Sequence, residues 1–269
     1  MSERALLHID EAGNARVTLN RPDVHNAFDP EMVATLTATL ERLAREPEVR
    51  SLVLRGAGKS FCAGADIEHM KKSASCTPEQ NFEAAQQTAR MLHALYSLDK
   101  PTVACVHGAV RGGGCGLVAA CDIALASRDA TFRLSEVKIG VIPAMISPYV
   151  IAAIGERMAR RYMLTGEEFD AVEAQRIGLV HEAVGSEELE SSVNNVLAQL
   201  GTSGPNAVSA IKKLIPISAH APIGAHIVEE TARRIAAIRA TPEAQEGLSA
   251  FLEKRKPSWV KRKPGSTIK

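Results

Sequence analysis

The stretch RGGGCGLVAACD, residues 111–122, places three consecutive glycines directly before an apolar run. Glycine-rich turns that open a helix are typical of anion sites, because free backbone N–H groups and the positive end of the helix dipole converge there. The anion could be a bound phosphate, or a negative charge that exists only while a reaction proceeds. The stretch is therefore a candidate site whose chemistry the rest of the sequence must decide.

A second stretch of the same kind, GKSFCAGADI at residues 58–67, follows a predicted strand and ends in small residues and an acid. Both stretches offer backbone N–H groups on turns with little side-chain bulk. Two such donors that converge on one oxygen would form an oxyanion hole. Each stretch alone can be a tight structural turn, so it is their joint occurrence that favours a catalytic role.

Neither stretch completes a nucleotide-binding motif. Residues 58–60 read GKS, like the end of a Walker A loop, but Val53 stands where the leading glycine belongs. A dinucleotide fingerprint that begins at Gly112 fails as well, because Leu117 stands where its third glycine belongs. We therefore do not expect a nucleotide triphosphatase or a dinucleotide-binding domain.

The elements that must position these turns alternate between strands and helices, which predicts an α/β domain with parallel crossovers. Two helix starts are clear: Asp29 is a predicted N-cap before Pro30, and Thr77 with Gln80 matches a capping box. The expected strands are the short β-branched stretches 15–20, 50–56, 102–108, 122–127, 131–135 and 178–184.

Beyond about residue 186 the pattern is almost wholly helical. Joints are expected at GTSGP (201–205) and at Pro216. We therefore divide the chain into a core of residues 1–197 and a C-terminal helical segment of residues 198–269. The candidate helices are 187–200, 205–214, 222–239 and 242–254.

Composition narrows the function classes. Of 269 residues 45% are hydrophobic and 23% charged, which is ordinary for a globular protein, and the net charge of +1 attracts neither nucleic acid nor an acidic membrane. Five cysteines without C-x-x-C spacing indicate no metal site and no disulfide framework. The N-terminus has no apolar leader, and the uncharged run 139–155 contains two prolines. We expect a soluble, cytoplasmic protein without a membrane partner.

Six ordered blocks extend over nearly the whole chain: 20–29, 58–67, 100–127, 134–143, 164–184 and 251–259. Taken together, they resemble the enoyl-CoA hydratase/isomerase (crotonase) family. The resemblance implies a spiral of ββα units, the crotonase superhelix, followed by a helical segment that serves trimerisation or acts as a lid. It also implies an acyl-CoA thioester as substrate, coenzyme A being part of the substrate rather than a separate cofactor, and a homotrimer or homohexamer.

The resemblance assigns the oxyanion hole to the backbone N–H groups of Ala65 and Gly113. Chemistry at the α-carbon of a thioester passes through an enolate, whose negative charge lies on the oxygen that these groups would hold. One donor of this kind is worth about 10²–10³ in rate. Gly113 also lies at the start of a predicted helix, whose dipole would point at that oxygen.

The same resemblance implies that one segment lines the bent coenzyme A, with Ile67 near the adenine. His25 lies in a block that contacts coenzyme A in the family, although a role in a turn explains it equally well. The lining residues implied are Ala63, Gly64, Ala65, Asp66 and Ile67.

Hydratases of the family use two glutamates to activate water, and this chain has only one of them. Gly116 stands at the first position and Glu136 at the second. A single glutamate is the pattern of family isomerases, yet the block GVIPAMISPYV (140–150) resembles bacterial methylglutaconyl-CoA hydratases. We expect Glu136 to be the general acid and base, with a pKa raised by burial beside an apolar acyl chain.

Other polar residues have structural explanations that are at least as good. Tyr149, Ser147 and Glu68 are candidates for positioning water, while His107 is expected to cap or pack. Cys62 and Cys115 are expected to be small core residues. The basic tail could meet phosphates of coenzyme A or be a solvated terminus; its residues are Lys254, Arg255, Lys256, Lys261, Arg262 and Lys263.

Three functions remain open at this point. The first is hydration of a short or branched enoyl-CoA, similar to 3-methylglutaconyl-CoA. The second is an enoyl-CoA isomerase, or another lyase of the family, that uses Glu136 alone. The third is a relative that binds RNA through the basic tail, which the near-neutral charge and the aromatic content of 4% disfavour.

Overall fold

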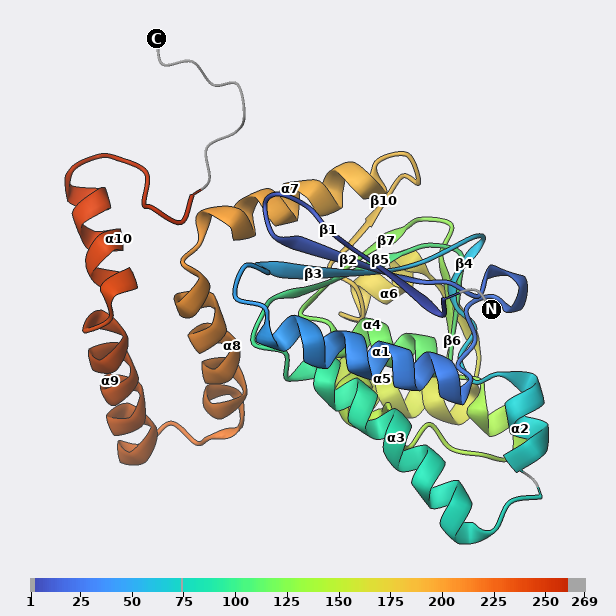
Figure 1. Ribbon diagram of the computed structural model, residues 1–269. Coiled ribbons are helices and arrows are strands. Elements are labelled where there is room, and N and C mark those ends of the chain that lie inside the picture. The colour runs from blue at the N-terminus through green and yellow to red at the C-terminus, as the bar shows by residue number, and fades with distance from the viewer. Residues whose placement is uncertain (1–2, 74, 261–269) are drawn as a thin grey trace.

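The computed structural model describes residues 3–73 and 75–260, and a sheet of six strands lies at its centre (Figure 1). Only the pair β1–β2 is antiparallel, and every other neighbouring pair is parallel. Strand β5 is buried along its whole length, as expected for a parallel strand covered on both faces. In spatial order the strands are β1 (Ala5–Ile9), β2 (Asn14–Leu19), β3 (Ser51–Gly56), β5 (Thr102–Val106), β7 (Ile123–Ser127) and β10 (Glu182–Val184).

A second sheet of four short strands runs beside the first, and together with the helices it forms a structural repeat. Each of β3, β5 and β7 is followed by a short strand of this sheet and then by a helix. The repeat is the ββα spiral that the resemblance implied, and it carries both glycine-rich stretches on the connections between the two sheets. In spatial order the short strands are β4 (Ser60–Cys62), β6 (Ala109–Arg111), β8 (Thr131–Arg133) and β9 (Glu168–Asp170).

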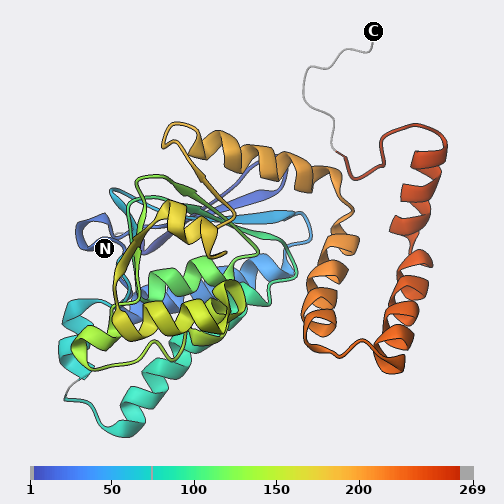
Figure 2. The same ribbon diagram turned by 180° about the vertical axis from the view of Figure 1, so that it is seen from behind.

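Helices cover both faces of the large sheet (Figures 1 and 2). On one face, α7 (Leu189–Thr202) packs Val193 and Leu197 against Val53 and Val103 of the sheet. The other face carries the larger core, which buries one apolar stripe of α1: Met32, Val33, Leu36, Leu40 and Leu43. The helices there are α1 (Pro30–Arg45), α3 (Pro78–Tyr96), α4 (Gly113–Ala120) and α5 (Ser147–Thr165). Two short helices, α2 (Ile67–Ser73) and α6 (Ala171–Arg176), complete the core.

Both predicted helix caps are confirmed. The Asp29 carboxylate accepts from the backbone N–H of Met32 at 2.7 Å and satisfies one free donor of α1. Thr77 and Gln80 exchange side-chain and backbone hydrogen bonds in a complete capping box at the start of α3. These local signals explain why the sequence places both helices correctly.

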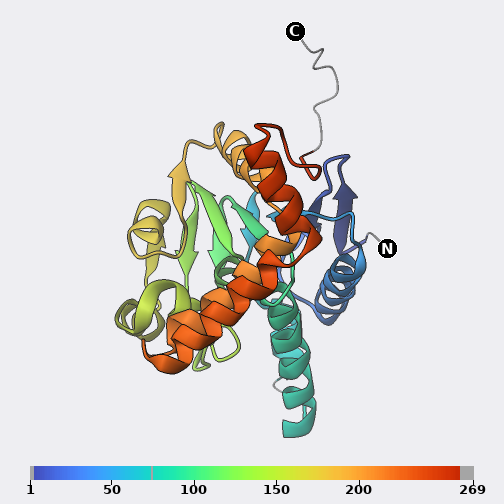
Figure 3. The same ribbon diagram turned by 90° about the vertical axis from the view of Figure 1, so that its left-hand side faces the viewer.

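The C-terminal helices project away from the two sheets (Figures 1 and 2), and in Figure 3, seen from their side, they lie in front of the core. They are α8 (Pro205–His220), α9 (Ala225–Arg239) and α10 (Pro242–Leu252). The segment is attached by Lys212, whose ammonium group lies 2.7 Å from the Asp122 carboxylate. The predicted boundary between residues 197 and 198 falls inside α7, and the division into two domains stays a prediction. The predicted joint at Pro216 is wrong, since α8 continues through it. An interior proline disfavours a helix, but the ion pairs of Lys212 with Asp122 and of Lys213 with Asp99 hold the turn before it against the core.

Within residues 3–73 and 75–260, no helix is long and apolar enough to cross a membrane. No group of three or more His, Cys, Asp or Glu side chains in this part of the chain is arranged to hold a metal ion.

Candidate active site

Backbone hydrogen bonds fix the loop that carries Ala65. Phe28 and Ala65 form a parallel bridge: the N–H of Phe28 donates to the carbonyl of Gly64 at 2.7 Å, and the N–H of Asp66 donates to the carbonyl of Phe28 at 2.9 Å. The N–H of Ala65 lies between these bonds and donates to no group among the described residues, and Ala65 is exposed. The loop therefore presents one free amide on a backbone held on both sides.

Gly113 begins α4 and is brought directly against this loop. Its own N–H is one of the helix-start donors that have no intrahelical partner, and it donates to nothing in the described chain. A Cβ on Gly64 would lie 3.3 Å from the Gly113 nitrogen and 2.7 Å from the carbonyl oxygen of Arg111. Gly64, with φ +82°, thus allows the two loops to touch. The structure brings together the two segments whose amides the resemblance assigned to one oxyanion hole.

Glu136 lies beside the same turn. It begins a short 3₁₀ helix, Glu136–Ile139, and a Cβ on Gly112 would lie only 2.8 Å from its Oε1. Its other oxygen, Oε2, is buried without a hydrogen-bond partner among residues 3–73 and 75–260. Burial raises the pKa of this carboxyl above its usual value. A hydrogen bond with its own backbone opposes this rise but does not outweigh burial. A carboxyl group with a buried, unpartnered oxygen beside the glycine turn has the properties expected of a proton-transfer residue.

Gly116 lies one turn further along α4 and is buried. A Cβ there would be 2.2 Å from Cγ2 of Ile146 and 3.6 Å from Cδ2 of Leu92. Neighbouring side chains therefore fill the space beside Gly116, the position to which the resemblance assigned the first glutamate of a hydratase.

The residues implied to line coenzyme A take different positions. Ile67 is 66% exposed and Ala63 is half-buried, so both can contact a ligand. Asp66 is 7% exposed and is used within the fold: it accepts from the backbone N–H groups of Glu68 and His69 and pairs with Arg21. Burial alone would raise the pKa of Asp66, but these bonds outweigh it and lower the pKa. His25 is exposed, with Nδ1 2.9 Å from the Ser60 hydroxyl and a φ of +53°, as expected of a turn residue.

Arg21 is a residue that sequence reasoning missed. Its guanidinium lies 2.8 Å from the Asp66 carboxylate, donates to the carbonyl of Ala27 at 2.6 Å and approaches Asp29 at 3.3 Å. It thereby joins the N-cap of α1 to the loop of Ala65. The signal available in the sequence was its place in the block NRPDVHNAFD, which belongs to the resemblance but contains no acid or nucleophile in an obvious catalytic role.

The remaining polar candidates are used elsewhere. Ser147 donates to the carbonyl of Ala144 at 2.8 Å, and Glu68 is 73% exposed and pairs with Lys71. Tyr149 packs against Tyr96 with ring centroids 5.4 Å apart. His107 lies 3.0 Å from the carbonyl oxygen of Gly58 through Nε2. None of these contacts places a second acid beside Glu136.

The cysteines of the two glycine-rich stretches are core residues, as expected. Cys62 and Cys115 are buried, and burial raises the pKa of each thiol to about 12. Both are therefore protonated at neutral pH and are poor nucleophiles.

The basic tail is only partly described. Arg255 is paired with Glu246 at 2.6 Å and with Glu253 at 2.7 Å, so its charge is neutralised within the chain. Lys254 and Lys256 are exposed. Lys261, Arg262 and Lys263 lie outside the described residues.

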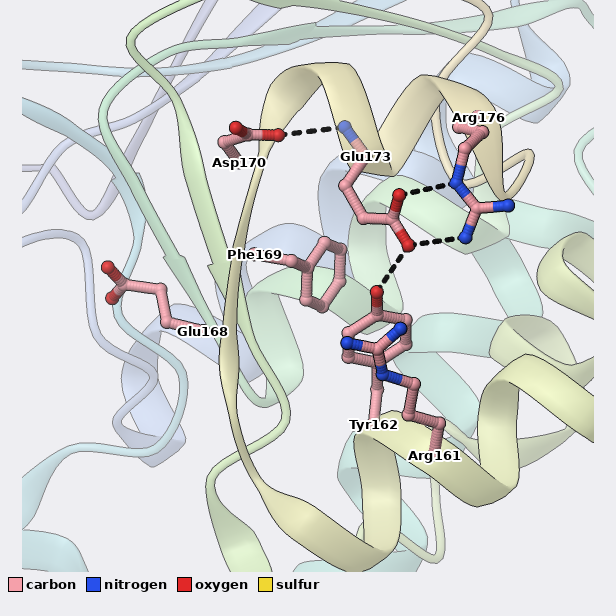
Figure 4. A pocket seen from close by; sticks show the side chains of 7 residues that line it. All are labelled: Arg161, Tyr162, Glu168, Phe169, Asp170, Glu173 and Arg176. Atoms are coloured by element: carbon pink, nitrogen blue, oxygen red, sulfur yellow. Dashed lines mark hydrogen bonds and ion pairs between the residues drawn. The ribbon is translucent and has the colours of Figure 1, made fainter.

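Two hollows of the surface lie away from Glu136, Ala65 and Gly113. One of about 340 Å³ is lined by α5, β9 and α6, where Glu173 binds Arg176 and the Tyr162 hydroxyl (Figure 4). Hydrogen bonds from Arg176, followed by Tyr162, lower the pKa of Glu173 to about 2, so the charges there are already paired. The other, of about 420 Å³, is lined by residues that include Arg55 and His107. Glu136, Ala65 and Gly113 line neither hollow.

Comparison with known proteins agrees with this geometry. The profile of the family described as enoyl-CoA hydratase/isomerase matches residues 10–262. The chain belongs to this family. It has the crotonase fold: the structure of an enoyl-CoA hydratase from Shewanella pealeana superposes with a TM-score of 0.92 at 40% identity, over 95% of this chain and 96% of that one.

Two relatives with specific names are similar along most of the chain. An (E)-benzylidenesuccinyl-CoA hydratase of Thauera aromatica is 32% identical over 91% of this chain and 94% of the relative. A 2,3-dehydroadipyl-CoA hydratase of Escherichia coli is 31% identical over 91% of this chain and 94% of the relative. The chain is thus an enzyme of the enoyl-CoA hydratase class, and an acyl-CoA substrate is consistent with its family.

Proposed function

We propose that this enoyl-CoA hydratase adds water to a short or branched enoyl-CoA, similar to 3-methylglutaconyl-CoA, with Glu136 as its single general acid and base. The observation that carries the proposal is the buried Oε2 of Glu136, which has no partner in the described chain and belongs to a carboxylate that lies against Gly112. The amides of Ala65 and Gly113 are free on adjoining loops. This combination matches the needs of thioester hydration.

In the proposed reaction the thioester oxygen accepts hydrogen bonds from the amides of Ala65 and Gly113. The Glu136 carboxylate takes a proton from water while the water oxygen forms a bond to C3, and the electron pair of the double bond moves toward the thioester oxygen. The resulting enolate is stabilised by the two amides. Glu136 then gives its proton to C2, so that one water has been added and the carboxylate is restored. Coenzyme A takes part only as a portion of the substrate.

The segment after Glu136 supports an acyl group whose carbon chain near the double bond is apolar, even where its far end carries a carboxylate. This segment exposes several apolar side chains that have no function in the described core; they are Val137, Ile139, Val141, Ile142 and Met145. The names of the Thauera and Escherichia relatives denote thioesters of unsaturated dicarboxylic acids, as 3-methylglutaconyl-CoA is. The block 140–150, with its resemblance to methylglutaconyl-CoA hydratases, supports the same substrate class.

An enoyl-CoA isomerase is the second candidate, and Gly116 is the observation that favours it. An isomerase needs one carboxylate, which removes a proton at C2 and returns it at C4. Within residues 3–73 and 75–260, Glu136 is the glutamate that has a buried, unpartnered oxygen and lies at this turn. The two reactions change the absorbance of the conjugated thioester in opposite directions.

The experiment follows this absorbance with three substrates. Crotonyl-CoA and 3-methylglutaconyl-CoA should lose absorbance as they are hydrated, and faster turnover of the second would support the branched substrate. A 3-enoyl-CoA should stay unchanged. A gain of absorbance with the 3-enoyl-CoA, with no loss for the other two substrates, would show that the enzyme is an isomerase and not a hydratase.

We also propose that the protein assembles as a homotrimer or homohexamer through its C-terminal helices. Apolar side chains are exposed there, among them Ile215 at 60%, Val228 at 61% and Phe251 at 80%. Light scattering after size exclusion would determine the mass in solution, and a monomer would refute the assembly.

A further inference from the structure

The N-cap glycine of α4 and one glycine within the helix lie against side chains of the segment that follows β8. Gly112 and Gly116 are separated by one helical turn, and the N–H of Gly116 donates to the carbonyl of Gly112. The first lies against Oε1 of Glu136 and the second against Cγ2 of Ile146. Glu136 and Ile146 therefore occupy neighbouring places along one face of the same helix.

We propose that Ile146 is the residue that keeps this site to a single carboxylate, because its side chain occupies the room that an acid at position 116 would need. Ile146 is 3% exposed and sits at the N-cap of α5, where its carbonyl accepts from the backbone N–H groups of Tyr149 and Val150. The start of α5 thus fixes its Cα, and its side chain cannot leave α4 without unfolding that turn.

The distances predict that the conflict at position 116 decreases stepwise as Ile146 is shortened. A Cβ at position 116 would lie 2.2 Å from Cγ2 of Ile146 and 2.8 Å from its Cβ, and the next neighbour, Cδ2 of Leu92, is at an acceptable 3.6 Å. Shortening Ile146 to alanine removes the first conflict only. Shortening it to glycine removes both, and glycine is tolerated at an N-cap.

The inference has a chemical consequence that rests on the proposed function. With position 116 closed, Glu136 both takes the proton from water and returns it to the substrate. A second carboxylate, once room is made for it, would lie one helical turn from Glu136 and could share this work.

The packing is tested by Gly116→Ala in three backgrounds: unchanged, Ile146→Ala and Ile146→Gly. We expect Gly116→Ala to lower the thermal midpoint by roughly 2–10 °C in the first, because the core is overfilled. The loss should be smaller in the second. In the third it should become a gain of a few degrees, about what replacing glycine by alanine in a helix provides.

Gly114→Ala is the matched control. Its Cβ would conflict with the carbonyl oxygen of Cys62 at 2.4 Å, which a change at Ile146 does not touch. Its penalty should be the same in all three backgrounds. If the penalty of Gly116→Ala is also the same in all three, Ile146 does not close the position and the proposal is wrong.

The chemistry is tested by comparing Gly116→Glu/Ile146→Gly with Gly116→Gln/Ile146→Gly, which has the same size and no charge. The glutamate variant should show a further ionisation in the pH profile of hydration that the glutamine variant lacks. Identical profiles would overturn the chemical part. Absence of hydration in the unchanged enzyme would contradict the proposed function instead, while the stability series would still decide the role of Ile146.

Discussion

The Glu136 carboxylate lies against the bare Cα of Gly112, close enough that a Cβ there would be 2.8 Å from Oε1. Gly112 has φ +46° and ψ −113°, and its N–H donates to the carbonyl of Arg133 at 2.9 Å. The same residue therefore makes room for the acid, begins the helix that carries Gly113 and ties that helix to β8. Glycine is required here both by backbone conformation and by the close approach of Glu136.

Substitution Gly112→Ala should displace Glu136 and lower kcat by about 10²-fold or more, with a smaller effect on KM, because misplaced catalytic groups lose rate steeply. Steady-state kinetics with crotonyl-CoA would measure both. Gly155→Ala is the matched control, since Gly155 has φ +72° and no atom within 4 Å of the added Cβ. Both variants should lose stability through backbone strain of about 1–3 kcal/mol. If both lose activity equally, the contact with Glu136 is not the cause.

The raised pKa of Glu136 sets the acid limb of the activity profile. The base must be ionised, so kcat/KM should fall as the pH drops through the pKa of Glu136, and this fall should occur above the range of an ordinary carboxyl group. A profile of kcat/KM between pH 4 and pH 9 checks this. A fall that begins only below pH 4.5, the unperturbed value for glutamate, would contradict burial of the carboxylate in the free enzyme.

The same shift predicts that Glu136 destabilises the fold at neutral pH. A carboxyl whose pKa is higher in the folded state stabilises it when protonated, and that stabilisation is lost as the pH rises through the folded pKa. Glu136→Gln should therefore raise the thermal midpoint at pH 8, with the difference shrinking toward pH 4. Glu156→Gln, a change in an exposed pair with Arg160, should shift it little. A destabilised Glu136→Gln at pH 8 would refute the prediction.

Arg21 should act as a positioning residue for the oxyanion loop. Lysine carries a point charge and cannot hold Asp66, Asp29 and the carbonyl of Ala27 together, so Arg21→Lys should loosen the bridge between Phe28 and Ala65. We expect kcat to fall roughly tenfold, less than the 10²–10³ that loss of a whole donor costs.

Arg4→Lys is the control for this effect. Arg4 pairs with Asp29 at 3.1 Å and with Glu31 at 2.9 Å, and no contact joins it to Asp66. The variant Arg4→Lys should therefore have an unchanged kcat. Equal losses of kcat in both variants would show that the charge network acts on general stability rather than on the loop of Ala65.

Local signals explain which elements could be predicted from the sequence. The caps at Asp29 and Thr77 act within one turn and were found. Strands β4, β6 and β9 have three residues each and were missed, because so short a stretch shows no alternation. Strands β8 and β10 are equally short and were found, because they lie within the longer predicted stretches 131–135 and 178–184. Strand β1 was missed as well, since its sequence ALLHI is apolar at four of five positions and shows no alternation of apolar and polar residues.

The site was predictable as a set of residues and not as an arrangement. Glu136, Ala65 and Gly113 were selected through the resemblance, and their catalytic roles stay predictions. The contact of Glu136 with Gly112 joins residues from two separate ββα repeats. The contact of Gly116 with Ile146 depends on how α5 packs on α4. Such contacts depend on tertiary packing, which no local pattern reveals.

The most direct test of the central claim is the rate of hydration of crotonyl-CoA by the unchanged enzyme and by Glu136→Gln, followed by loss of thioester absorbance at pH 8. We expect the unchanged enzyme to hydrate the substrate and the variant to be slower by about 10²–10⁴-fold while remaining folded. Hydration at the same rate in both would show that the proton is carried by another group, and the account of a single buried carboxylate would be wrong.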